Sequence, residues 1–226
     1  MAVLEARDLR AELRSDSGTR RVLDGISLDV AAGEIVDITG PSGSGKTTLL
    51  RALARLLPRA TGTLTLDSVP ADKIAPQRWR ALVALLPQKP AIVDGDVRAN
   101  LLLPWTLKIR HGETQPSDAE LDAALERVGL TEIALDREAA RLSVGQAARV
   151  ALLRVLLTSP RVLLLDEPDA ALDDASAAAV GCYAAELASA GGAVVRVRHR
   201  SSDGLATKRF VLADGRLTLV DEGSTS

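Results

Sequence analysis

The residues that could do chemistry begin with a glycine-rich stretch near position 40. It reads Gly40-Pro41-Ser42-Gly43-Ser44-Gly45-Lys46-Thr47 and is followed by Thr48. The spacing fits G-x-x-x-x-G-K-[ST], a loop whose backbone N–H groups cradle the phosphates of a nucleotide. In such a loop Lys46 reaches the β and γ phosphates, and the Thr47 hydroxyl ligates Mg²⁺. The alternative is a tight glycine turn that binds nothing.

Two adjacent carboxylates form a second candidate. The apolar run Val162-Leu163-Leu164-Leu165 leads directly into Asp166 and Glu167. A buried strand of this kind delivers both side chains to the carboxyl end of a sheet, where α/β proteins bind their ligands. There we expect Asp166 near the metal ion and Glu167 near the attacking water. Without the glycine-rich stretch, an acidic turn after a core strand would explain this pair equally well.

With three further segments, these stretches resemble the nucleotide-binding subunit of ABC transporters over nearly the whole chain. Leu142-Ser143-Val144-Gly145-Gln146 is similar to the family signature Leu-Ser-Gly-Gly-Gln, with valine in place of the first glycine. Gln88 matches the Q-loop glutamine, Ala171-Leu172-Asp173 matches the D-loop, and His199 matches the switch histidine. All five elements follow the order found in the family.

The resemblance implies a role for each matching residue. Asp166 would hold Mg²⁺ through water, Glu167 would be the general base, His199 would contact the γ-phosphate, and Gln88 would sense the γ-phosphate and the metal ion. The remaining candidate ATP contacts lie in the signature and the D-loop: Ser143, Gly145, Gln146 and Asp173. Ser143 and Gly145 would act in trans, because family members pair head to tail as a homodimer around two Mg-ATP.

The same resemblance implies a partner and a place in the cell. The homodimer would drive a separate transmembrane permease from the cytoplasmic face of the membrane. The segment after Gln88, with Gly95-Asp96-Val97 and Pro104-Trp105, is most similar to the iron-export-type small ABC systems. A soluble ABC-type ATPase, such as an iron–sulfur assembly ATPase, is the alternative. A monomeric phosphoryl-transfer kinase would leave Leu142 to Gln146 unexplained.

Two departures from the family pattern concern aromatic and charged residues. No Tyr, Phe or Trp precedes Trp79, so the aromatic that usually stacks on adenine is missing, and we expect an aliphatic or arginine side chain near Leu13 or Arg14 to contact the base. Val194-Val195-Arg196-Val197-Arg198 carries two arginines where the family has an apolar strand. The resemblance implies that this strand lies beside the one that carries Asp37, which is equally unusual there. Because a buried arginine is costly unless paired, we hypothesise that Asp37 pairs with Arg196 or Arg198 across the sheet.

The amino-acid composition argues against several other classes of protein. The 226 residues carry a net charge of −2 with a pI near 5.8, which gives no basic field for a nucleic acid. The single cysteine, Cys182, excludes an internal disulfide, and Cys and His are too scarce for a zinc site. We expect no signal peptide and no membrane span, since no uncharged apolar run reaches eighteen residues.

The pattern of apolar residues and the resemblance together predict the fold. We expect one domain over residues 1–226, an α/β phosphate-loop NTPase core of the ABC-ATPase kind, with an N-terminal antiparallel β lobe and a helical lobe inserted at approximately 89–157. Strands are predicted at 3–9, 22–30, 34–39, 61–67, 82–86, 161–165, 193–198, 210–212 and 216–219. Helices are predicted at 47–57, 76–80, 96–103, 117–128, 131–135, 145–157 and 175–190. A capping box is predicted at Ser117-Asp118-Ala119-Glu120.

Overall fold

An antiparallel sheet forms the N-terminal lobe. In this computed structural model, which describes residues 2–15, 18–168, 174–198 and 203–220, the sheet has the order β2-β1-β4-β5. Its strands are β1 (Ala2–Ser15), β2 (Gly18–Ala31), β4 (Thr61–Leu66) and β5 (Val69–Pro70). Along β2 the residues Ile26, Leu28 and Val30 are buried and alternate with exposed neighbours, so one face of this sheet packs on the core.

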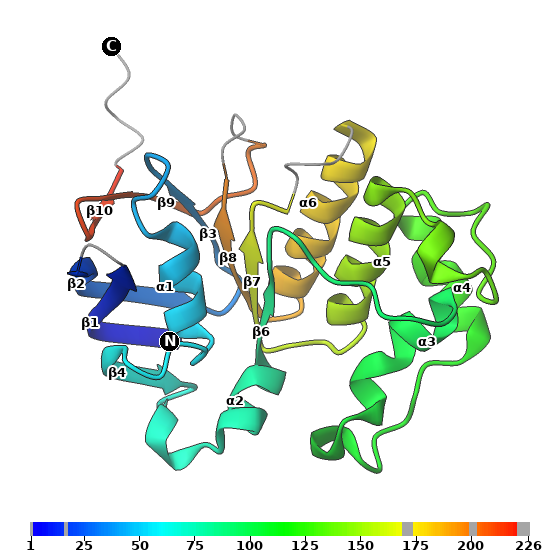
Figure 1. Ribbon diagram of the computed structural model, residues 1–226, viewed down its shortest axis with the longest axis horizontal. Coiled ribbons are helices and arrows are strands. Elements are labelled where there is room, and N and C mark those ends of the chain that lie inside the picture. The colour runs from blue at the N-terminus through cyan, green and yellow to red at the C-terminus, as the bar shows by residue number, and fades with distance from the viewer. Residues whose placement is uncertain (1, 16–17, 169–173, 199–202, 221–226) are drawn as a thin grey trace.

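A second, mixed sheet forms the centre of the molecule (Figure 1). Its order is β10-β9-β3-β8-β7-β6, and every neighbouring pair is parallel except β9 with β10. The bounds are β3 (Ile35–Thr39), β6 (Val83–Leu86), β7 (Val162–Asp166), β8 (Ala193–Val197), β9 (Lys208–Ala213) and β10 (Arg216–Leu219). Every residue of β7 and β8 is buried, as expected for parallel strands covered on both faces.

Helices cover both faces of this central sheet. Alternation along β3 sends Val36 and Ile38 into one apolar cluster with α1 (Lys46–Leu53). Ile35 enters a second cluster, with α5 (Val144–Leu156) and α6 (Asp174–Ser189). In Figure 1, α1 and α5 accordingly lie on opposite sides of the strands. The glycine-rich loop and the start of α5 are therefore held on different faces of one sheet.

The helical lobe has its own core. Its helices are α3 (Val97–Leu102) and α4 (Asp118–Arg127), with short 3₁₀ turns η2 (Leu103–Thr106), η3 (Lys108–Arg110) and η4 (Ala139–Arg141). Leu101 and Leu121 pack with Val150 and Leu153 of α5, so α5 belongs to both cores. The predicted capping box at the start of α4 is confirmed. Between the lobes, η1 (Ala71–Lys73) and α2 (Pro76–Leu82) lead into β6.

One predicted helix is wrong. Residues 131–135 form turns, in which the Ile133 N–H donates to the Leu130 carbonyl at 3.0 Å. Five residues give too few helical hydrogen bonds to offset the cost of nucleating a helix. Ile133 and Leu135 are buried in the core of the helical lobe, so packing fixes this segment without a helix.

The long helix α6 carries the single cysteine of the chain. Cys182 is exposed and has a free thiol, and it directly follows Gly181. None of the helices in the described ranges combines the length and the apolar content needed to cross a lipid bilayer.

Candidate functional site

The glycine-rich loop connects β3 to α1, as the sequence predicts, and two glycines fix its path. Gly40 has φ 142°, and a Cβ there would lie 2.1 Å from the Leu212 carbonyl oxygen of β9. Gly45 caps α1 with φ 105°, and its Cβ would lie 2.6 Å from Val22 Cγ1. Because side chains would clash at both positions, the backbone can curl between β9 and β2 only with glycine there.

Two polar groups of this loop fit a polyphosphate. The Lys46 ammonium is buried and donates to the carbonyl oxygens of Gly40 at 2.9 Å and Pro41 at 3.0 Å. Both acceptors are neutral, so the positive charge stays available to an anion. The Ser44 hydroxyl is buried, and no hydrogen-bond partner meets it within the described part of the chain. A buried polar group without a partner is costly, so an acceptor from a ligand would stabilise the loop.

The acidic pair lies beside this loop. Asp166 ends β7, and its Oδ1 accepts a hydrogen bond of 3.2 Å from the Thr47 hydroxyl at the start of α1. Burial raises the pKa of Asp166, while the Thr47 hydrogen bond acts in the opposite direction. Glu167 has φ 50°, a left-handed conformation that is uncommon outside glycine, and its N–H donates to the Val197 carbonyl at 3.1 Å. Its Oε2 accepts a hydrogen bond of 2.6 Å from Gln88 Nε2.

The signature residues lie elsewhere. Ser143 caps α5 in a capping box with Gln146, with Gln146 N donating to Ser143 Oγ at 3.3 Å and Ser143 N to Gln146 Oε1 at 2.9 Å. Val144 is 77% exposed, and a Cβ on Gly145 would have no atom within 4 Å. Within the described ranges, no hydrogen bond joins residues 142–146 to the glycine-rich loop. Asp173, with the rest of the D-loop, and His199 lie outside the described residues.

Comparison with known proteins decides the family. The sequence profile described as "ABC transporter" matches residues 23–170, which is more than half of the chain. The chain belongs to the ABC transporter family. As a member of that family it is an ATP-binding ATPase.

Three curated relatives show how the similarity is spread. The chain is 44% identical over 163 residues to protein STAR1 of rice, covering 72% of this chain and 46% of that protein. It is 42% identical over 201 residues to the hemin import ATP-binding protein HmuV of Nocardia farcinica, covering 87% and 68%. It is 37% identical over 160 residues to the probable iron export ATP-binding protein FetA of Escherichia coli, covering 71% and 69%. The chain thus spans less than half of the first relative and about two thirds of the others.

Solved structures share the fold. One described as the ATP-binding subunit of an ABC transporter superposes with a TM-score of 0.83 at 22% identity, covering 97% of this chain and 90% of that one. The ATP-binding cassette MJ0796, solved as a dimer bound to ADP and Pi, superposes with a TM-score of 0.80 at 23% identity, covering 95% and 96%. These structures confirm the predicted α/β architecture of an ABC ATPase cassette.

The oxygen donors of the cassette fit magnesium as an ion bound chiefly through ATP. In the described part of the chain, no three Asp, Glu, His or Cys side chains come together as a metal site. Mg²⁺ commonly uses one or two protein oxygens, several waters and the substrate phosphates. Thr47 and Asp166 supply a hydroxyl and a carboxylate next to the loop, which fits this coordination preference of Mg²⁺. Gln88 turns its Nε2 toward Glu167.

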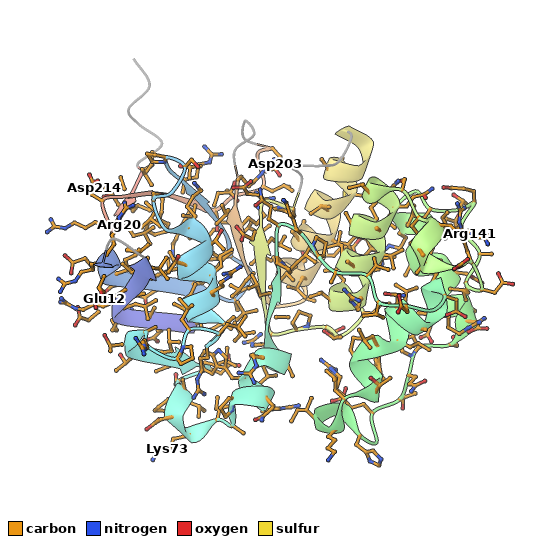
Figure 2. All side chains as sticks on the ribbon, viewed as in Figure 1. Glu12, Arg20, Lys73, Arg141, Asp203 and Asp214 are labelled. Atoms are coloured by element: carbon orange, nitrogen blue, oxygen red, sulfur yellow. The ribbon has the colours of Figure 1, made fainter. Side chains whose placement is uncertain are left out.

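A hollow lies next to the loop. Its volume is about 440 Å³, and it is lined by Arg20, Arg21, Val22, Pro41, Ser42, Gly43, Ser44, Ala213, Asp214 and Gly215. Figure 2 labels Arg20 and Asp214 on this side of the molecule. Leu13 is the cross-strand neighbour of Arg20 and is 45% exposed, while the side chain of Arg14 lies outside the described residues. The prediction of an aliphatic or arginine contact to the base remains a prediction.

The predicted ion pair across the sheet is confirmed. Arg196 donates to both carboxylate oxygens of Asp37, at 2.6 Å and 3.0 Å, and both residues are buried. Sequence reasoning missed a second acid, Asp203, which accepts from Arg196 at 2.9 Å and 3.1 Å. The available signal was a charge count, because two arginines in a buried strand need more than the one carboxylate that Asp37 supplies.

Proposed function

We propose that this chain is the ATP-hydrolysing subunit of an ABC transporter, which pairs head to tail with a second copy around two Mg-ATP and drives a separate permease. One observation supports this above the others. The loop lysine, the Thr47–Asp166 contact and the Gln88–Glu167 contact gather at one end of the sheet, while the signature helix begins on the other face and points outward. Each chain thus carries two unlike halves of a site.

The chemistry of the first half follows from these contacts. Lys46 would exchange its bonds to the loop carbonyls for the β and γ phosphates, and Ser44 would gain an acceptor. Thr47 and Asp166 would hold the magnesium ion, which neutralises charge on the phosphates. Glu167 would orient and deprotonate the attacking water, with Gln88 reporting its state. Catalysis in such a site consists mainly of positioning and charge stabilisation.

The second half is the start of α5. The first N–H groups of a helix lack intrahelical acceptors, and together with the helix dipole they favour an anion. Ser143 and Gln146 satisfy two of these groups between them, and the exposed Val144 and the open space over Gly145 let a second chain approach closely. We assign this end of α5 to the γ-phosphate bound by the partner copy. By resemblance, Asp173 and His199 complete the site.

The permease would dock beside the segment that follows Gln88, and its transported substrate is a separate prediction. A hollow of about 600 Å³ between the segment after Gln88 and the start of α5, lined in part by Ile92, Val93 and Leu142, can receive a helix of a membrane partner. Such docking would place the chain at the cytoplasmic face of the membrane. FetA is named for iron export and HmuV for hemin import, so iron export by this chain stays a prediction. Deletion of the gene for this chain tests this prediction: if the chain drives iron export, the cellular iron content should rise.

The variant Glu167→Gln tests the proposed catalysis. We expect ATP binding to survive, because Lys46 and the loop are unchanged, whereas turnover falls by about 10²–10⁴-fold with the general base removed. Phosphate release measures turnover, and size-exclusion chromatography with ATP should show a trapped dimer. Glu126→Gln, an exposed glutamate on α4, serves as the matched control.

Three outcomes would contradict parts of this proposal. Normal hydrolysis by Glu167→Gln would remove the assignment of the base. A Glu167→Gln variant that stays monomeric at saturating ATP would argue against the composite site. Co-purification of the wild-type chain with a soluble scaffold protein, and not with a multi-span membrane protein, would favour the iron–sulfur assembly alternative.

A further inference from the structure

Four charged side chains form a network at the end of the central sheet, here called the charge cluster: Asp37, Arg196, Arg198 and Asp203. Arg196 is 2% exposed and lies between two carboxylates, bonded through two nitrogens to Asp37 and through two to Asp203. Arg198 Nη1 lies 2.7 Å from Asp203 Oδ2 and 3.9 Å from Asp37 Oδ2. The cluster balances two positive and two negative charges, which is what keeps buried ions tolerable.

The cluster joins three segments that meet at the candidate site. Asp37 is on β3, three residues before the first glycine of the phosphate loop. Arg198 directly precedes His199, Arg196 lies three residues before it, and Asp203 follows four residues after that histidine. The Arg198–Asp203 ion pair therefore joins the last described residue before 199–202 to the first described residue after them. The Arg198 N–H also donates to the Ile38 carbonyl at 3.2 Å, which ties the same point to β3.

Helix α6 leaves room for Asp203 and Leu205 beside it. Asp203, labelled in Figure 2, has a side chain that is 27% exposed, and its Oδ1 also accepts from the Leu205 N–H at 3.1 Å. A Cβ on Gly181 in the middle of α6 would lie 3.0 Å from Leu205 Cδ1 and 3.7 Å from Asp203 Oδ2. Glycine inside a helix lowers its stability relative to alanine, so the close approach of the Asp203–Leu205 turn accounts for its presence.

The carboxyl group of Asp203 is held in its ionised form. Burial acts to raise the pKa of Asp203, but the hydrogen bonds from Arg196 and the Leu205 N–H and the charges of both arginines outweigh it and lower that pKa. The pKa of Arg196 is raised, since its bonds to Asp37 and Asp203 outweigh its burial. At neutral pH the ion pairs of Asp203 with the two arginines are thus formed by full charges.

We propose that Asp203 is a positioning residue for ATP hydrolysis: by clamping Arg196 and Arg198, it fixes the backbone of Arg198, the residue before His199 in the sequence, relative to the strand that leads into the phosphate loop. This inference rests on the proposed function, in which His199 contacts the γ-phosphate. Apolar side chains would hold β3 and β8 together at least as well as a buried ion pair does. What charged groups add is direction, because a guanidinium bonded on two sides sets both the distance and the orientation of the segments it joins.

The variant Asp203→Asn in the full chain tests this role. We expect kcat to fall about 10–100-fold, since a displacement of about 1 Å in a catalytic group has an effect of that size. The KM for ATP should stay within about twofold, because Lys46 and the phosphate loop are not displaced. Asp118→Asn is the matched control: Arg98 holds Asp118 with the same two-bond geometry, at 2.9 Å and 2.7 Å, but on the exposed surface of the helical lobe.

A double-mutant cycle with His199→Ala separates positioning from general destabilisation. If Asp203 acts through the histidine, Asp203→Asn should cause no further loss of kcat in the His199→Ala chain. Losses that multiply in the double variant, or an Asp203→Asn variant with wild-type kcat, would overturn the proposal. Should Asp203→Asn fail to fold, Asp203→Ser, which also removes the carboxylate, enters the same cycle, with the same two outcomes deciding.

Amide hydrogen exchange gives a readout that does not depend on ATPase activity. Asp203→Asn should speed exchange at the described amides of Arg198 and Leu205, which lie next to the Arg198–Asp203 ion pair, by about tenfold or more. Exchange unchanged at both amides would overturn the clamp. If the wild-type chain itself hydrolysed no ATP while exchange responded as expected, the proposed function would fail and the clamp would stand as a structural device.

Discussion

Replacing Arg196 by methionine tests how much the buried ion pairs of the charge cluster contribute to the free energy of unfolding. The variant leaves Asp37 as a buried carboxylate whose nearest remaining cation in the cluster is Arg198, at 3.9 Å. Removing one partner of a buried ion pair costs about 3–5 kcal/mol. For a domain of this size that loss lowers the melting temperature by about 6–20 °C, at about 2–4 °C per kcal/mol.

Urea unfolding measures this cost if two probes agree. Tryptophan fluorescence and circular dichroism should give coincident transitions, which licenses a free energy of unfolding. Arg98→Met, which breaks the exposed pair with Asp118, should cost no more than about 1 kcal/mol. Asp37→Leu combined with Arg196→Met should recover most of the loss, because an apolar pair can replace a buried ionic one. A cost below about 1 kcal/mol for Arg196→Met alone would refute the reasoning, since it would equal that of a surface pair.

Two further predictions concern the loop and the effect of pH. Gly40→Ala should weaken ATP binding at least about tenfold by equilibrium titration, because its Cβ would lie 2.1 Å from a backbone carbonyl of β9 and the loop must shift; unchanged affinity would show that the loop adapts freely. The pKa of Asp203 is lowered in the folded chain, so its charge, faced by Arg196, Arg198 and Asp37, stabilises the fold above the unfolded pKa of about 3.9, and this is lost as the pH falls through the folded value. The melting temperatures of wild type and Asp203→Asn should therefore differ fully at pH 7 and converge in acid; a difference that grows in acid would reverse the assigned sign.

Local rules made the centre of the site predictable. A strand, a glycine loop and a helix follow one another within about twenty residues, so the path from β3 to α1 needed no distant information. The proximity of Thr47 and Asp166 was predictable because Asp166 ends β7 and Thr47 begins the helix that follows the loop after β3, so both lie at the carboxyl edge of the parallel strands. The Asp37–Arg196 pair was predictable from two facts together: a buried charge is costly without a partner, and the family resemblance places the two strands side by side.

The contacts that could not be predicted from the sequence join segments that are far apart along the chain. Asp203 lies beyond the end of β8 in a turn without periodicity, and the fold alone brings it to Arg196. The Gln88–Glu167 bond joins residues 79 positions apart and depends on side-chain directions that a pattern does not encode. Residues 131–135 have apolar spacing suited to a helix, yet tertiary packing holds them as turns.

The one thiol of the chain makes the pairing of two copies directly measurable. Cys182 is exposed on α6, so a maleimide dye or nitroxide can be attached to the natural sequence without removing any other cysteine. A symmetric pair would then carry two probes and report one separation. Titrating ATP into such a labelled sample would show whether that separation changes, and the Glu167→Gln chain would hold the pair in its nucleotide-loaded arrangement.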